Sequence, residues 1–241
     1  MPKSLHIAVA QPRTSPADIP ANVEEHVRLI ADAAADGADV CVFPELSLTG
    51  YELDAIASDP RCRVGKDDPR LEPLRQACRD GGIHALVGVA LEEGGQLLLA
   101  TLVFGPSGDT VDHYAKQHLH GHELDLFTPG TRHVVLDIGG CRLGLAICYD
   151  AAVPRHAREL SQAGAEVCVV SALFGVGSED RLREQVARAA GLGMWVALSQ
   201  YSGTTGPFET FGGSGVWRPD GVAVAELGKE ISAYIVAVTS Y

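Results

Sequence analysis

The sequence predicts an α/β fold in which mixed sheets are covered by helices. Predicted helices alternate with short strands in both halves of the chain, while hairpin-like strand pairs occupy the middle and the C-terminal part. Several strands are continuous apolar runs without polar alternation, which is typical of strands buried on both faces. These observations predict a mixed sheet system with helices on its surface.

In the first half, Ile19–Ala35 is expected to form an amphipathic helix, because Val23, Val27 and Ile30 share one face. A strand at His6–Ala10 precedes it. Further strands are expected at Asp39–Phe43, Ile83–Ala90, Leu97–Phe104 and Thr110–Ala115, with a second helix through Leu71, Leu74 and Ala77.

The second half repeats the alternation and ends in β structure. Helices are expected from Pro154 and from Glu179, where Leu182, Val186 and Ala189 share a face. The expected strands are His133–Asp137, Cys141–Ile147, Glu166–Val170, Met194–Gln200, Gly213–Trp217, Val222–Glu226 and Ile231–Val238. Because nothing resembles an inter-domain linker, we expect residues 1–241 to form a single domain.

Composition excludes several classes of partner. The formal charge is 19 − 31 = −12, which repels phosphate backbones and anionic lipids, so neither a nucleic acid nor a membrane is expected as a partner. The six cysteines are scattered and form no Cys-x-x-Cys pair, which favours a reducing compartment. Without a signal-like apolar core at the N-terminus or a long apolar run, a cytoplasmic location is expected.

Three residues stand where strands should end. Cys148 follows the apolar run Leu143–Ile147, a position that suits a nucleophile. Glu45 follows a strand and Pro44, so it could be a general base, or simply an exposed glutamate in a turn. Lys116 follows another strand and, taken alone, would be a solvated charge at a strand end.

Taken together, the segments around these residues resemble the nitrilase, or carbon–nitrogen hydrolase, superfamily. The matching blocks occur in order: FPELSLTGYE around Glu45, YAKQHLHGHELDLFTPG around Lys116, and GLAICYD around Cys148. The resemblance implies a four-layer αββα sandwich, with Glu45 as base, Lys116 as oxyanion stabiliser and Cys148 as nucleophile. It also identifies Glu123 as the second glutamate that orients the lysine.

The resemblance further implies how an amide would be attacked. The Cys148 thiolate would form a thioester, with Lys116 and the backbone N–H of Tyr149 stabilising the oxyanion. Lys116 is expected to lower the pKa of Cys148 by favouring its charged form. The residues expected to line the substrate pocket are Tyr51, His122, Ala172 and Leu173. A small amide is the implied substrate, no cofactor or metal is needed, and a homodimer or higher homo-oligomer is expected.

Local departures from the family pattern bear on the substrate. Ala151 and Ala152 stand where carbamoylase-like relatives place an arginine that grips a carboxylate, which disfavours N-carbamoyl amino acids unless Arg155 or another cation reaches in. Tyr149–Asp150 replaces the Trp-Glu pair of true nitrilases and favours an amide over a nitrile. Acyl transfer to an amine and a catalytically silent binding subunit remain open alternatives.

Two tempting motifs carry less weight. His118, His120 and His122 would share one face of an extended strand and could suggest a metal site, but Gly121 should break that strand. Gly212, Gly213 and Gly215 could suggest a phosphate cradle, but no helix is expected to follow them.

Overall fold

A computed structural model of the protein describes residues 4–240, which contain two six-stranded sheets and a two-stranded hairpin. The first sheet has the order β14 (Ala233–Ser240), β1 (Ser4–Gln11), β2 (Val40–Val42), β3 (His84–Glu93), β4 (Gln96–Phe104) and β5 (Thr110–Ala115). The second has the order β13 (Ala223–Glu226), β12 (Gly215–Trp217), β9 (Trp195–Ser199), β8 (Val167–Ser171), β7 (Cys141–Ile147) and β6 (Val135–Ile138).

Each sheet has a parallel centre with antiparallel strands outside it. Strands β1, β2 and β3 are parallel, as are β7, β8 and β9. The carboxyl ends of parallel strands are where α/β proteins place functional side chains. Here the ends of β2 and β7 carry the segments with Glu45 and Cys148.

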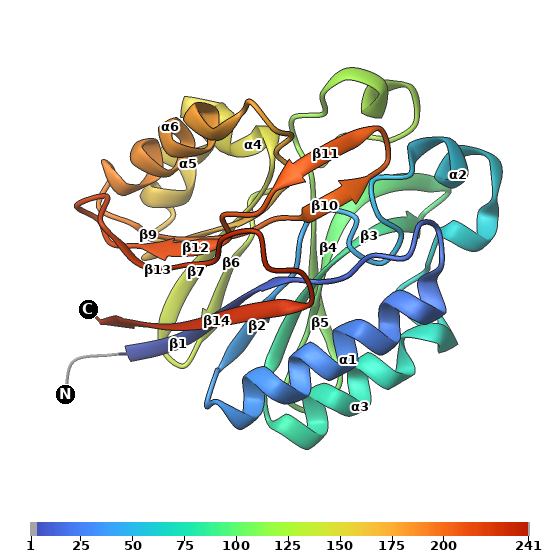
Figure 1. Ribbon diagram of the computed structural model, residues 1–241, viewed down its shortest axis with the longest axis horizontal. Coiled ribbons are helices and arrows are strands. Elements are labelled where there is room, and N and C mark those ends of the chain that lie inside the picture. Colours follow the sequence, from blue (N-terminus) through green and yellow to red (C-terminus); the bar gives the residue numbers. More distant parts are fainter. Residues whose placement is uncertain (1–3, 241) are drawn as a thin grey trace.

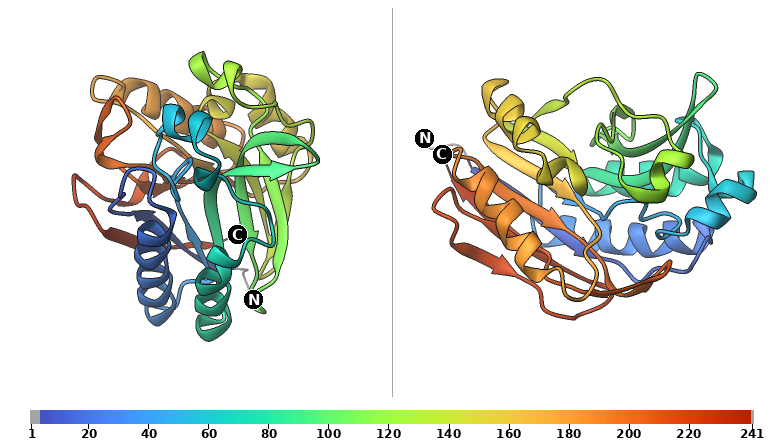
Figure 2. Two further views of the ribbon diagram at one scale, coloured as in Figure 1. Left: turned by 90° about the vertical axis from the view of Figure 1, so that its right-hand side faces the viewer. Right: turned by 90° about the horizontal axis from the view of Figure 1, so that it is seen from above.

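Helices cover the outer face of each sheet. Helices α1 (Ile19–Ala35) and α3 (Glu72–Gly81) pack on the first sheet, while α5 (Pro154–Gln162) and α6 (Glu179–Ala190) pack on the second. Figure 1 shows these two helix pairs on opposite sides of the molecule, and the side view in Figure 2 agrees. The four-layer αββα sandwich is therefore confirmed.

Strand β1 explains why the sequence lacks polar alternation. Ile7 and Val9 face the layer between the two sheets, whereas Ala8 and Ala10 face the layer beneath α1 and α3. All four are fully buried. Burial on both faces removes any need for polar side chains along the strand.

Most expected elements are present with boundaries shifted by one to three residues, and α1, β5 and β7 match their expected ranges. The sequence did not predict the short helices α2 (Leu53–Ser58) and α4 (Tyr149–Ala152), or the hairpin of β10 (Ser202–Thr205) and β11 (Phe208–Phe211). Within residues 4–240, no helix combines the length and apolarity needed to cross a bilayer.

One glycine lets the Glu45 turn approach β3. A Cβ atom on Gly88 would lie 2.2 Å from the Pro44 carbonyl oxygen and 2.5 Å from the Leu46 nitrogen. The Leu48 N–H donates a hydrogen bond to the Gly88 carbonyl oxygen (3.1 Å), which closes the turn onto the strand. Any side chain here would push the turn, and Glu45 with it, away from the sheet.

Gly88→Ala is therefore expected to lower the free energy of unfolding by about 1–3 kcal/mol, the usual cost of overpacking a core. Urea denaturation would measure it. Gly65→Ala is the matched control, because a Cβ at Gly65 meets no atom within 4 Å. Equal stability of the two variants would contradict the role given to Gly88.

Candidate active site

Three strand ends bring their polar residues into one cavity. Glu45 follows β2, Lys116 directly follows β5, and Cys148 directly follows β7. The Lys116 ammonium donates to Glu45 Oε1 (2.6 Å) and to Glu123 Oε1 (2.7 Å). All four side chains line a cavity of about 310 Å³. The structure therefore brings together the four residues that the sequence predicted.

Lys116 and its two carboxylates are buried. The side chains of Lys116 and Glu45 are completely inaccessible, and that of Glu123 is 2% exposed. Removing charges from water is costly unless they are paired, and here one ammonium serves two carboxylates. A lysine has three N–H donors, so one remains after these two bonds.

The Glu45 and Glu123 segments are held by neighbouring groups. The Tyr201 hydroxyl donates to the Glu45 carbonyl oxygen (2.5 Å). The Tyr51 hydroxyl donates to Glu123 Oε1 (2.6 Å), and the His120 N–H donates to Glu123 Oε2 (2.9 Å). With Lys116, these bonds fix the Glu123 carboxylate at the cavity wall.

Cys148 adopts a backbone conformation that is rare for a residue with a side chain. Its φ is +45° and its ψ is −100°. Such strain persists only where the surroundings enforce it, and it is concentrated at functional sites. The Cys148 N–H donates to the Ser171 carbonyl oxygen (2.9 Å), which anchors the residue to β8. The five other cysteines are buried, whereas Cys148 is partly exposed.

Asp150 connects the Cys148 turn to the segment that carries Lys116. Its Oδ2 accepts hydrogen bonds from the Ile147 N–H (3.0 Å) and the Tyr114 hydroxyl (2.6 Å). Its Oδ1 accepts from the His118 N–H (2.9 Å) and the His118 ring (2.8 Å). These bonds lower the pKa of Asp150 although burial opposes the charge. The two halves of the site are thereby tied together.

His118, Asp150 and His156 place potential metal-ligand atoms within 4.8 Å of one another. Both Asp150 oxygens already accept two hydrogen bonds each, and His156 Nε2 lies 3.1 Å from the Leu145 carbonyl oxygen. These groups therefore suit a hydrogen-bond network better than a metal centre.

Burial raises the pKa values of both Glu45 and Cys148. Desolvation raises the pKa of Glu45 to about 7, opposed by Lys116 and reinforced by Glu123. Desolvation and the Glu45 carboxylate raise the pKa of Cys148 to about 12, although Lys116 acts in the opposite direction. Lys116 does lower the pKa of Cys148, as predicted, but desolvation and the Glu45 carboxylate outweigh it, so the net shift is upward.

Tyr51 and Leu173 line the cavity as expected, whereas the other two predicted pocket residues, His122 and Ala172, do not. The His122 side chain is 94% exposed, because Gly121, at a φ of +57°, starts a 3₁₀ helix (Gly121–Asp125) that ends the histidine alternation. His120 lines the cavity instead and stacks on Tyr149 with ring centroids 4.7 Å apart. Ala172 is fully buried outside the cavity.

Sequence reasoning missed a further part of the cavity wall. It is formed by Phe174, by Arg181 and Gln185 of α6, and by Phe208 of the β10–β11 hairpin. The rings of Phe208 and Tyr51 pack edge to face, with their centroids 5.6 Å apart. The apolar spacing in α6 predicts only which residues face the core. Arg181 and Gln185 are polar and lie outside that pattern, so the sequence did not predict that they line the cavity.

The αββα architecture and a buried glutamate–lysine pair beside a cysteine are features of a thiol hydrolase. The carbon–nitrogen hydrolase family model matches residues 6–239, and the chain belongs to this family of nitrilase-superfamily enzymes, which hydrolyse non-peptide C–N bonds.

Similar proteins and a solved structure support the same family assignment. The chain is 29% identical over 94% of its length to a hydrolase of Pseudomonas protegens, of which the match covers 80%. It is 26% identical over 87% of its length to an omega-amidase of Xenopus tropicalis, of which the match covers 79%. An amidase from Nesterenkonia superposes with a TM-score of 0.87 at 28% identity, covering 99% of this chain and 90% of that one.

Removing the buried ammonium should destabilise the protein. Lys116→Met leaves Glu45 and Glu123 buried without their cation, so the free energy of unfolding should fall by about 3–5 kcal/mol. Urea denaturation at neutral pH tests this. Adding Glu123→Gln to Lys116→Met should recover part of the loss, and a double variant no more stable than the single one would contradict this explanation.

Proposed function

We propose that the protein is a thiol amidase that hydrolyses a small aliphatic amide or carbamoyl amine through a thioester on Cys148. The observation that carries the proposal is the convergence of Glu45, Lys116, Glu123 and Cys148 in one small cavity. Its volume of about 310 Å³ lies at the lower end for small-molecule sites, which suits a short substrate.

Glu45 is suited to accept the proton of Cys148. Its Oε1 is occupied by Lys116, whereas its buried Oε2 has no well-aligned partner among the described residues. The nearby thiol favours the charged form of the carboxylate. A base whose pKa lies near neutrality both accepts and returns a proton efficiently.

The proposed reaction has two halves. Cys148 Sγ attacks the amide carbonyl carbon as its proton passes to Glu45; the third Lys116 N–H and the Tyr149 N–H stabilise the oxyanion. Tyr149 begins α4, so its N–H has no partner within the helix. The C–N bond then breaks as Glu45 protonates the leaving nitrogen. Glu45 next deprotonates a water that hydrolyses the thioester, and the thiol is restored.

The alternatives use the same groups. A nitrile would first give a thioimidate, which becomes a thioester when water adds and ammonia leaves, and an amine could replace water as the acyl acceptor. A silent binding subunit is less well supported, because burying three charged groups around a strained cysteine costs stability that binding alone does not require. We also propose that the chain forms homodimers or higher homo-oligomers.

The direct test measures ammonia release from short amides, carbamoyl amines and nitriles, with the intact mass of the protein recorded during turnover. An acyl adduct that disappears in Cys148→Ala supports the thioester. Hydroxamate formed on adding hydroxylamine would indicate acyl transfer. Absence of both turnover and adduct would leave only the binding role.

The pH dependence should follow Glu45. Below a pH of about 7 the raised pKa leaves Glu45 protonated and unable to accept the thiol proton, so kcat/KM should fall about tenfold per pH unit on the acid side and level off above it. Stopped assays from pH 5 to 9 measure this profile. An unchanged profile down to pH 5 would show that Glu45 is not the base.

A further inference from the structure

The wall formed by α6 carries a cation with no internal partner. Arg181 lines the same cavity as Cys148 and Lys116. Within residues 4–240, no hydrogen bond or ion pair to its guanidinium is found, whereas Lys116 is committed to Glu45 and Glu123. Arg181 is exposed to solvent and is therefore the cation of this cavity that is free to bind a ligand.

Other arginines near the site are already used. Arg155, which the sequence left open as a substrate cation, donates to Glu159 Oε1 (2.6 Å) and is 78% exposed on α5. Arg188 donates to the carbonyl oxygens of Ala151 (2.8 Å) and Ala152 (3.0 Å). It thereby holds the two alanines that replace the expected carboxylate-binding arginine.

Gln185 supplies an independent sign of a ligand. It stands four residues after Arg181, on the same helix face, and lines the same cavity. Its side chain is 6% exposed, yet its Oε1 has no hydrogen-bond partner. Buried amide oxygens nearly always accept a hydrogen bond, so a donor on a bound molecule, or a water in its place, is required here.

We propose that Arg181 binds a carboxylate on the substrate while Gln185 Oε1 accepts a hydrogen bond from an N–H of the same molecule, so that the preferred substrates are short amides or carbamoyl amines bearing a carboxylate. This inference rests on the proposed amidase function. A guanidinium matches a carboxylate with two parallel hydrogen bonds. Because the chain carries a net charge of −12, an anionic substrate needs such a local cation to enter.

The carboxylate could lie on either side of the bond that breaks. Succinamate carries it on the acyl group, and butyramide differs from succinamate only by a methyl in place of the carboxylate. N-carbamoylglycine carries it on the substituted nitrogen, which is the leaving group when the bond to that nitrogen breaks, with N-ethylurea as its neutral counterpart. The member of each pair that the enzyme prefers reports which side faces Arg181.

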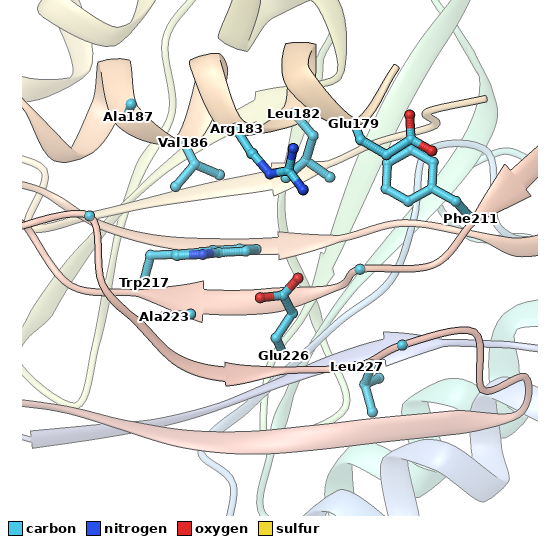
Figure 3. Close-up of a pocket in the computed structure, with 13 residues that line it drawn as sticks. Glu179, Leu182, Arg183, Val186, Ala187, Phe211, Trp217, Ala223, Glu226 and Leu227 are labelled. Carbon is cyan, nitrogen blue, oxygen red and sulfur yellow. The ribbon is translucent and has the colours of Figure 1, made fainter. Parts of the chain in front are cut away.

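The experiment compares kcat/KM for each pair in the wild type, Arg181→Ala, Arg181→Lys and Arg183→Ala. Arg183 is the matched control, because it lies on α6 but pairs with Asp180 (2.9 Å) and faces the separate outer groove seen in Figure 3. We expect Arg181→Ala to lower the preference for the carboxylate-bearing amide by about tenfold or more, mainly through KM. The preference of Arg181→Lys should lie between those of the wild type and Arg181→Ala, and the preference of Arg183→Ala should equal that of the wild type.

A binding experiment separates this inference from the proposed function. Calorimetry would measure the binding of succinamate and of N-carbamoylglycine to the Cys148→Ala variant and to the double variant that also carries Arg181→Ala. Binding that depends on Arg181 without turnover of any amide would overturn the proposed function alone. Hydrolysis of butyramide with a preference that Arg181→Ala leaves unchanged would overturn this inference alone. Absence of both turnover and Arg181-dependent binding would overturn both.

Discussion

The geometry of the site depends on one buried interaction, the contact of a single ammonium with two carboxylates. Lys116, Glu45 and Glu123 come from three separate segments, and none of them is more than 2% exposed. Because an unpaired charge at this depth is costly, the closed arrangement of these segments is most stable when all three side chains meet. The network therefore holds the cavity in shape as well as supplying its charge.

This interaction also determines the proton affinities around Cys148. Desolvation is the main reason why protons are held more tightly at Glu45 and Cys148 than in water, and one positive charge does not fully compensate two buried carboxylates. Cys148 is consequently a thiol in the resting protein, and in the proposed reaction it loses its proton as it attacks. The raised pKa values of Glu45 and of the thiol thus have the same two causes, burial and an excess of negative charge.

Much of the fold was accessible from sequence because it follows from burial. Strand β1 is apolar on both faces because it lies between two apolar layers, and α1 is apolar only on the face that packs on the sheet. The hairpin of β10 and β11 was missed because Gly203 and several threonines interrupt any apolar pattern. The proposed catalytic residues could be predicted from short contiguous sequence blocks. Arg181 and Gln185 lie outside those blocks, and only the docking of α6 against the cavity brings them to the site.

The protonated state of Cys148 has a consequence for chemical durability. Peroxides attack thiolates far faster than thiols, and oxidation beyond the sulfenic state is irreversible in most proteins. Five of the six sulfurs are shielded by burial, and the sixth, although reachable, is shielded by its own proton. The resting protein should thus withstand oxidative stress that would inactivate an enzyme built around a permanently ionised cysteine.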